Sequence, residues 1–241
     1  MKDTKMIKLI KNNKKSYDDI WDKKIIKGCE SDVSNDGNRY NVAAQHLQRG
    51  DFLLDFGCGI GTFANIVRGM FEKIYGCEIS EKAIKVACSR GIHAVKVDID
   101  IDILPFENNF FDSVVCLDVI EHIKDPINLI KEMNRVLKPD GIIIITTPNI
   151  RHLKYILKII KYGEFPKTSD DNEMYDGGHI HYFTFKDIEF ILNDNGFRVA
   201  KKVGIGNTFK NGIWKFLNKK MKREFGSLGI MVKAYKVTDA C

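Results

Sequence analysis

Short apolar runs alternate with amphipathic stretches through the first two thirds of the chain. Five of the apolar runs predict β-strands: Phe52–Phe56, Lys73–Glu78, His93–Val97, Ser113–Leu117 and Gly141–Thr146. Between them, hydrophobic positions recur at helical spacing, for example over Ser80–Ser89 and Ile127–Val136. Strands that alternate with helices in this way indicate βαβ units and a mostly parallel sheet buried on both faces.

The last third of the chain adds further elements of the same kind. A helix is predicted over Phe185–Asn195, where Gly196 ends it, and strands are predicted near Phe197–Val203 and Ile230–Val237. We find no internal repeat. The pattern is therefore that of an α/β fold.

Two amphipathic segments interrupt the alternation. Asn149–Ile180 leaves the carboxyl end of a predicted strand and is longer than a plain connection, which predicts a lid or a wall of a substrate site. Ile213–Phe225 is a second, basic amphipathic stretch. For both we favour packing on the sheet or at the mouth of the site, with contact to a membrane surface as the alternative.

The N-terminal part differs in composition from the rest. It is rich in lysine and asparagine up to about Lys15, and a helix-like segment with Tyr17, Ile20, Trp21 and Ile25 follows. We divide the 241 residues into a helical N-terminal extension, residues 1–38, and one α/β domain, residues 39–241. Residues 149–180 are the insertion in that domain.

Charge, hydropathy and cysteine content indicate the partners and the compartment to expect. The 38 basic and 32 acidic side chains give a net charge of +6 that is spread along the chain, so an anionic partner is only weakly supported. The longest purely apolar runs, such as Ile142–Ile145, are far shorter than the ~18 residues that span a bilayer. Lysines interrupt any signal peptide, and the six cysteines form no Cys-x-x-Cys pair. We therefore expect a cytoplasmic protein with buried thiols.

A glycine-rich loop directly after the first strand carries the clearest chemistry. Gly57, Gly59 and Gly61 are spaced by two, and such glycines let a ligand approach the backbone closely. Asp55 precedes the loop and suits a positively charged amino group better than a pyrophosphate. Glu78 ends the next strand, at the offset of ~20 residues where a carboxylate accepts hydrogen bonds from ribose hydroxyls.

With these residues the sequence resembles the class I S-adenosylmethionine-dependent methyltransferases, whose first motif is Asp-x-Gly-x-Gly-x-Gly. The resemblance covers roughly Arg39 to Val203 and continues through an ordered series of motifs: Val97-Asp98-Ile99, Leu104-Pro105-Phe106, Phe111-Asp112, Val119-Ile120-Glu121-His122-Ile123, Arg135 to Gly141 and Thr147-Pro148-Asn149. Asp140 stands where the family usually has glycine, and aspartate also tolerates a tight turn. The resemblance implies a doubly wound, mostly parallel seven-stranded sheet with the last strand reversed.

The resemblance also implies that S-adenosyl-L-methionine is the cofactor and assigns its contacts. Asp55 and the three loop glycines would hold the methionine portion, and Glu78 would bind the ribose. Ile79 would pack on the adenine, with Leu117 at the end of the fourth strand completing the set. Asp98 would accept a hydrogen bond from the adenine amino group, beside the backbone of Ile99. Asp100 and Asp102 are competitors for that role.

Three histidines are candidate catalytic residues for the acceptor side. His122 follows the fourth strand, and in relatives the histidine of this Glu-His pair often faces the donor methyl group. His179 lies in a His-x-x-x-Phe-Thr arrangement similar to that of relatives that act on small hydroxyl-bearing molecules. If the segment is extended, His181 lies on the same side as His179. A structural role is the alternative for each histidine.

A divalent metal ion is a further alternative. Asp118-x-x-Glu121-His122 with the distant His179 resembles the acidic and histidine cluster of the ubiquinone-pathway O-methyltransferases and of the small-RNA end-modifying methyltransferases, which holds a divalent cation. Asp118 replaces the usual glutamate. Because Glu-His is widespread among relatives that bind no metal, we favour a histidine acting alone as a general base.

We expect methyl transfer to a hydroxyl of a small molecule, such as a sugar, a nucleotide-sugar or a quinol precursor, and the net charge allows an anionic one. The alternatives are an RNA methyltransferase, an N-methyltransferase that acts on a small molecule, and a cofactor-binding protein without turnover. No aromatic and basic residues interleave as in RNA-binding modules, so we do not favour a nucleic-acid partner. The sequence does not predict an oligomeric state.

Overall fold

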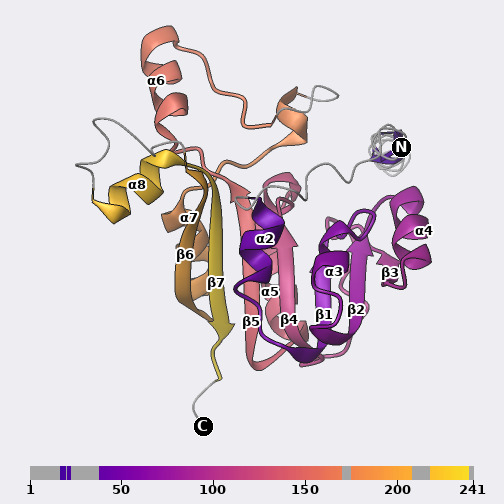
Figure 1. The fold of residues 1–241 in the computed structure, drawn as a ribbon. Coiled ribbons are helices and arrows are strands. Elements are labelled where there is room, and N and C mark those ends of the chain that lie inside the picture. Colours follow the sequence, from indigo (N-terminus) through magenta and orange to yellow (C-terminus); the bar gives the residue numbers. More distant parts are fainter. Residues whose placement is uncertain (1–16, 20, 23–37, 170–174, 208–217, 239–241) are drawn as a thin grey trace, which may run out of the picture.

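The computed structural model describes residues 17–19, 21–22, 38–169, 175–207 and 218–238. Within them, seven strands form one sheet, with helices on both of its faces (Figure 1). The strands are β1 (Gly50–Phe56), β2 (Phe71–Glu78), β3 (His93–Lys96), β4 (Phe111–Leu117), β5 (Leu137–Pro148), β6 (Phe197–Asn207) and β7 (Ser227–Lys236).

The strand order is β3-β2-β1-β4-β5-β7-β6. Strands β1 to β5 pair in parallel, and β7 runs antiparallel to both of its neighbours, β5 and β6. The expected doubly wound, mostly parallel seven-stranded sheet with a reversed last strand is therefore confirmed. All seven predicted strands are present, and β5 and β6 extend several residues beyond their predicted ends.

Alternating side chains divide the core into two layers because successive residues of a strand point to opposite faces. Leu54, Val114 and Ile143 pack with α5 (Pro126–Val136) and α7 (Phe185–Asp194). Their neighbours Leu53, Val115 and Ile144 pack on the other face with α2 (Arg39–Ala44) and α3 (Thr62–Ile66). This two-sided burial explains why the strands read as continuous apolar runs.

Capping residues place the helix starts where the sequence predicts them. Ser80 accepts a hydrogen bond from the backbone nitrogen of Ala83 and begins α4 (Glu81–Ser89). Thr184 and Asp187 form a reciprocal capping box at the start of α7. Between α5 and the main part of β5, Asp140 adopts a left-handed conformation with φ 58°, which explains why glycine is usual at this turn.

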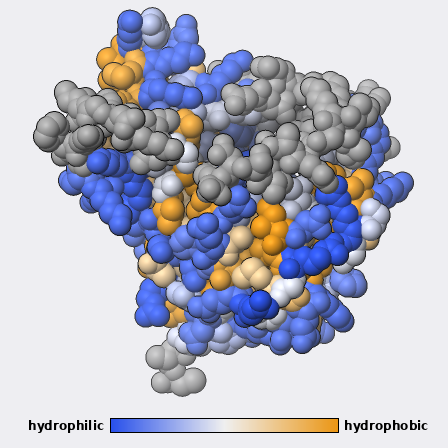
Figure 2. Space-filling model, viewed as in Figure 1, coloured by the Kyte–Doolittle hydropathy of each residue, from blue (hydrophilic) through white to orange (hydrophobic). Residues whose placement is uncertain are grey.

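The segment that follows β5 projects from the sheet. It forms α6 (Leu153–Tyr162), and Tyr155 is the buried residue of this helix. Leu157 and Ile160 are 52% and 74% exposed, and Figure 2 shows apolar residues beside strongly hydrophilic ones on this projecting part. Leu157 and Ile160 therefore do not pack on the sheet, which was one of the two placements predicted for this segment. No helix among the described residues is long and apolar enough to cross a bilayer.

Two predicted segments are only partly within the described residues. Residues 213–217 of the second basic stretch lie outside them, and its remainder forms most of α8 (Lys219–Gly226). Most of the extension 1–38 also lies outside them, as do Cys29 and Cys241. The division into residues 1–38, 39–241 and the insertion 149–180 stays a prediction.

Candidate functional site

A cavity of about 670 Å³ lies at the carboxyl ends of β1, β2 and β4. Because the carboxyl ends of parallel strands meet at one edge of the sheet, residues far apart in the sequence line it together. Its walls include the glycine loop, the residues after β2, β3 and β4, and parts of the short helices η2 (Ile120–His122) and η3 (Tyr175–Gly178). The structure thus brings most of the predicted donor and acceptor residues to one cavity.

The loop after β1 presents its backbone to the cavity. Gly57 and Gly59 line the cavity with φ angles of 73° and 52°, which only glycine adopts at little cost. A Cβ atom at Gly59 would lie 2.5 Å from the indole ring of Trp21. Gly61 is set back from the cavity wall, and a Cβ there would lie 2.0 Å from Ile92. The first two glycines shape the wall, whereas Gly61 allows close packing behind it.

Two carboxyl groups lie next to this loop in different surroundings. Glu78 lies in the cavity wall, where its carboxylate accepts hydrogen bonds from the backbone nitrogens of Gly59 (3.0 Å), Ile79 (2.9 Å) and Ser80 (3.0 Å). Asp55 is buried behind the loop, and its Oδ2 has no hydrogen-bond partner among the described residues. Burial, followed by the charge of Glu78, raises the pKa of Asp55 to about 7. Asp55 therefore lies inside the protein at the start of the loop and does not line the cavity.

The remaining predicted cofactor contacts also line the cavity: Ile79, Asp98, Ile99 and Leu117. Asp98 accepts one hydrogen bond, from the backbone nitrogen of Asp100 at 3.3 Å. Asp100 also lines the cavity, but Lys124 holds its carboxylate through its backbone nitrogen (3.0 Å) and its ammonium group (3.1 Å). Asp102 lies outside the lining and accepts from the backbone nitrogen of Asp98. This arrangement favours Asp98 for the adenine amino group.

The N-terminal extension also lines the cavity, which the sequence did not predict. Tyr17 and Trp21 belong to the lining, and the indole ring of Trp21 lies over Gly59. Burial, followed by the charges of Glu78, Asp100 and Asp98, raises the pKa of Tyr17. Asp18 fixes this segment by accepting a hydrogen bond from the hydroxyl of Ser80 at 2.5 Å. These residues reach the cavity by tertiary packing, so no local motif marks them.

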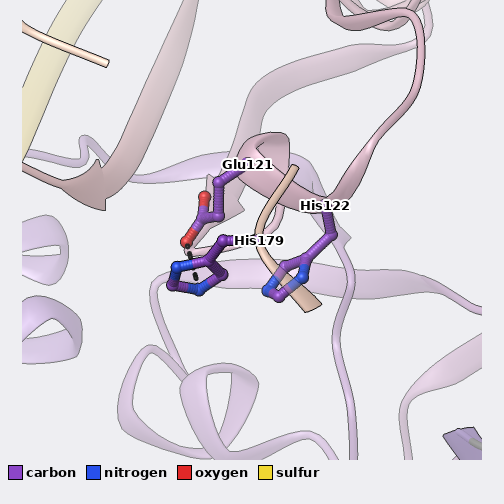
Figure 3. Close-up of side chains that lie close together, drawn as sticks. All are labelled: Glu121, His122 and His179. Atoms are coloured by element: carbon purple, nitrogen blue, oxygen red, sulfur yellow. Dashed lines mark ion pairs between the residues drawn. The ribbon is translucent and has the colours of Figure 1, made fainter. Parts of the chain in front are cut away.

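The acceptor end of the cavity holds a cluster of one carboxyl group and two imidazoles. Glu121, His122 and His179 each offer one ligand atom, and these atoms lie within 4.8 Å of one another (Figure 3). The distance from His179 Nε2 to Glu121 Oε1 is 3.8 Å. The backbone oxygen of Glu121 accepts from the nitrogens of Ile180 (2.9 Å) and His181 (3.0 Å). These bonds hold the segment after η3 against η2 and so bring His179 to the cluster.

The electrostatics of this cluster are unusual for a buried site. Both carboxyl oxygens of Glu121 are buried, and neither has a hydrogen-bond partner in the described part of the chain. Burial, followed by the charge of Asp118, raises the pKa of Glu121 well above its ordinary value. His122 Nδ1 lies 3.2 Å from the backbone oxygen of Gly178. A carbonyl oxygen only accepts, so Nδ1 carries a proton.

Asp118 does not join the cluster, although the sequence made it a metal-ligand candidate. Its φ angle is 53°, its Oδ1 accepts from the hydroxyl of Thr146 at 2.6 Å, and its Oδ2 lies 3.2 Å from Nε of Arg39. Arg39 and Tyr40 of α2 also line the cavity and were not predicted. The structure therefore gathers three of the four metal candidates.

His181 lies outside the lining of the cavity. Its Nε2 donates to the backbone oxygen of Lys124 at 3.4 Å, and its ring stacks on Phe183. His179 lines the cavity and His181 does not, so the two histidines do not share one side of it. The chain turns through left-handed conformations at Asp176 and Gly177 before it reaches these histidines.

A family of methyltransferase domains matches residues 37–202 of the chain. An uncharacterized protein of Methanocaldococcus jannaschii is 30% identical over 236 residues, which cover 92% of this chain and 88% of that protein. The ubiquinone biosynthesis O-methyltransferase of Thiobacillus denitrificans is 31% identical over 117 residues, 46% of this chain and 50% of that enzyme. An S-adenosylmethionine-dependent methyltransferase from Archaeoglobus fulgidus has a similar structure, with a TM-score of 0.61 and 20% identity over 82% of this chain and 91% of that one.

Proposed function

This chain belongs to the class I S-adenosylmethionine-dependent methyltransferases, and on that premise we propose that it methylates a hydroxyl oxygen of a small molecule with the help of a divalent cation. The observation that carries the proposal is the buried carboxyl group of Glu121, which lacks a hydrogen-bond partner among the described residues and faces His179. The relation to ubiquinone biosynthesis O-methyltransferases supports a hydroxyl acceptor.

The donor side of the cavity fits S-adenosylmethionine. Gly57 and Gly59 leave the loop backbone open to a ligand, and Glu78 is fixed by three backbone nitrogens at the place where a ribose is expected. When bound, the donor supplies a methyl group on a positively charged sulfur that needs no further activation. The chain then has to align the acceptor oxygen, exclude water and remove one proton.

The acceptor side fits a divalent cation. A buried carboxyl group close to two imidazoles requires a positive charge or a proton, because an unpaired buried charge is costly. Glu121, His122 and His179 would hold the cation. When bound, it would supply the charge that lowers the pKa of a hydroxyl beside it. Two imidazoles with one carboxylate favour Mn²⁺, Fe²⁺ or Zn²⁺ over Mg²⁺. This proposal departs from the metal-free general base that we favoured on the sequence.

Backbone contacts of the chain position the two histidines of the cluster. The backbone oxygen of Glu121 holds the segment of His179 in place, and the backbone oxygen of Gly178 orients His122. Thr168 and Ser169, which follow α6, belong to the cavity wall. A cavity of about 670 Å³ leaves room for the donor and a small acceptor, which supports a small molecule over a macromolecule.

The proposal is tested by cation binding and methyl transfer measured separately. Calorimetry with Mn²⁺ and Zn²⁺ should detect one site per chain, which Glu121→Gln should abolish without loss of donor binding. Glu189→Gln is the matched control because that glutamate pairs with Lys202 far from the cavity lining. If the wild-type protein binds neither Mn²⁺ nor Zn²⁺ in calorimetry, the proposed role of a cation is refuted.

The acceptor class is tested with methyl-labelled donor and three panels: small molecules with vicinal hydroxyls, small amines, and RNA. The proposal is supported if the labelled methyl group appears on a hydroxyl oxygen, if chelator abolishes this transfer and if Mn²⁺ restores it. Label on an amine or on RNA would refute the acceptor class. Full hydroxyl methylation in chelator would refute the cation and restore the histidines as the working hypothesis.

A further inference from the structure

A second buried carboxylate, Asp176, lies behind the acceptor cluster and carries no role in the proposed function. It has no exposed surface, and its backbone is left-handed with φ 50°. Oδ1 accepts from the backbone nitrogens of Thr168 (2.5 Å) and Ser169 (2.8 Å). Oδ2 accepts from the hydroxyls of Thr168 (3.0 Å) and Tyr182 (2.9 Å). One buried side chain thus organises the end of the insertion and the segment after η3.

These four donors decide the protonation state of Asp176. Two backbone N–H groups donate to Oδ1 and two hydroxyls donate to Oδ2, so both oxygens act as acceptors. A carboxylate without a proton only accepts hydrogen bonds. The hydroxyl hydrogen of Thr168 is therefore directed at Asp176 Oδ2.

The same hydroxyl oxygen lies 2.7 Å from His179 Nδ1. Thr168 has one hydroxyl hydrogen, and Asp176 takes it, so the threonine oxygen can only accept from the imidazole. His179 Nδ1 consequently carries the proton. In the neutral ring this is the single N–H group. The other nitrogen, Nε2, then has a lone pair and lies 3.8 Å from Glu121 Oε1.

We propose that Asp176 and Thr168 are positioning residues, which fix His179 as the Nδ1–H tautomer and so preset its Nε2 as an electron-pair donor beside Glu121. The proposal rests on the proposed function for the use of that lone pair, but the tautomer itself does not depend on it. An outer hydrogen-bonding partner that sets the tautomer of a ligating histidine typically changes metal affinity by 10–100-fold.

Asp176 contacts the ring of His179 through the hydroxyl of Thr168. The distance from His179 Nδ1 to Asp176 Oδ2 is 3.8 Å, which is too long for a direct hydrogen bond. Thr168 bridges this gap, and it belongs to the insertion that follows α6. This hydroxyl connects Asp176 to the ring of His179.

The first test is the tautomer of His179 in protein free of cation and donor, read from the ¹⁵N shifts of its imidazole ring. The resonance is assigned by its loss in His179→Gln. Wild type should show the Nδ1–H form, and Thr168→Val, which keeps the shape but removes the hydroxyl, should shift the ring toward the Nε2–H form. Thr168→Ser should restore the wild-type spectrum. His122 is an internal control because Gly178 fixes its tautomer.

The second test is calorimetry with Zn²⁺. Thr168→Val should weaken binding at least tenfold, and Thr168→Ser should retain wild-type affinity. If Thr168→Val does not fold, Asp176→Asn takes its place in both measurements, with Tyr182→Phe as the control that should leave the tautomer unchanged. An Nε2–H ring in wild type, or an unchanged ring in Thr168→Val, would overturn the proposal. A correct tautomer in a protein that binds no Zn²⁺ would instead refute the cation and leave the positioning roles standing.

Discussion

Replacing Asp55 by asparagine should stabilise the donor-free protein at alkaline pH. In the unfolded chain this carboxyl titrates near its ordinary value of 3.8, whereas in the folded protein burial, and then the charge of Glu78, raises the pKa to about 7. Between these pH values the folded protein keeps a proton that the unfolded chain has lost. The free energy of unfolding of the wild type therefore falls as the pH rises, by up to about 1.4 kcal/mol per pH unit.

Over the whole interval the loss amounts to about 4 kcal/mol. Asp55→Asn has no proton to lose at this position, so its free energy of unfolding should not show that fall. The difference between variant and wild type should grow from pH 4 to pH 7 and then stay constant. The assay is urea unfolding of donor-free protein at a series of pH values.

Asp112→Asn is a control of opposite sign. Burial alone would raise the pKa of Asp112, but hydrogen bonds from Lys138 and from the backbone nitrogens of Phe52 and Asp51 lower it. Its ionised form therefore stabilises the fold above its unfolded pKa, and the variant should lose that stability at neutral pH. If Asp55→Asn and wild type give parallel profiles between pH 4 and pH 8, the raised pKa of Asp55 is refuted.

Three further predictions concern the donor site and the turn at Asp140. Glu78→Gln should weaken donor binding by about 1.5–3 kcal/mol in calorimetry, since a charge-assisted hydrogen bond is lost, while the exposed Glu81→Gln should leave affinity unchanged. Trp21→Ala should lower donor affinity without lowering the melting temperature of the donor-free protein, because the indole covers the loop at Gly59; an unchanged affinity would remove the N-terminal extension from the site. Asp140→Gly should raise the free energy of unfolding by up to about 1 kcal/mol, because glycine adopts φ 58° without strain, and a lower melting temperature would show that the aspartate stabilises the turn.

The sequence predicted the parts of this protein that depend on neighbours along the chain. The strands, the serine cap of α4 and the glycine loop all depend on local spacing, and each lies where it was expected. Glu78 ends β2 and Asp98 comes shortly after β3, and the carboxyl ends of these strands meet at one edge of the sheet. The fold class therefore also predicts that the two residues lie close together. Asp55 was predicted in the right region, but the pattern did not distinguish a residue behind the loop from one in the cavity wall.

The parts that sequence reasoning missed depend on contacts between distant segments. Trp21 and Arg39 reach the cavity by packing across it, and nothing in their local sequence marks them. His181 does not line the cavity with His179, and its contacts with the backbone of Lys124 and the ring of Phe183 come from tertiary packing. The isolation of Glu121 is a property of three-dimensional burial, and a Glu-His pair looks the same whether or not its carboxyl group has a partner.

The position of β7 between β5 and β6 has a consequence for how the protein is made. While the ribosome is still synthesising residues before 227, the edge of β5 that β7 later covers carries the run Ile142–Ile145 with its backbone groups unpaired. An exposed, isoleucine-rich edge is a template for pairing with another chain. We therefore expect nascent chains halted before Ser227 to depend on chaperones and to aggregate when released, even though every strand of the donor-binding half has already been synthesised.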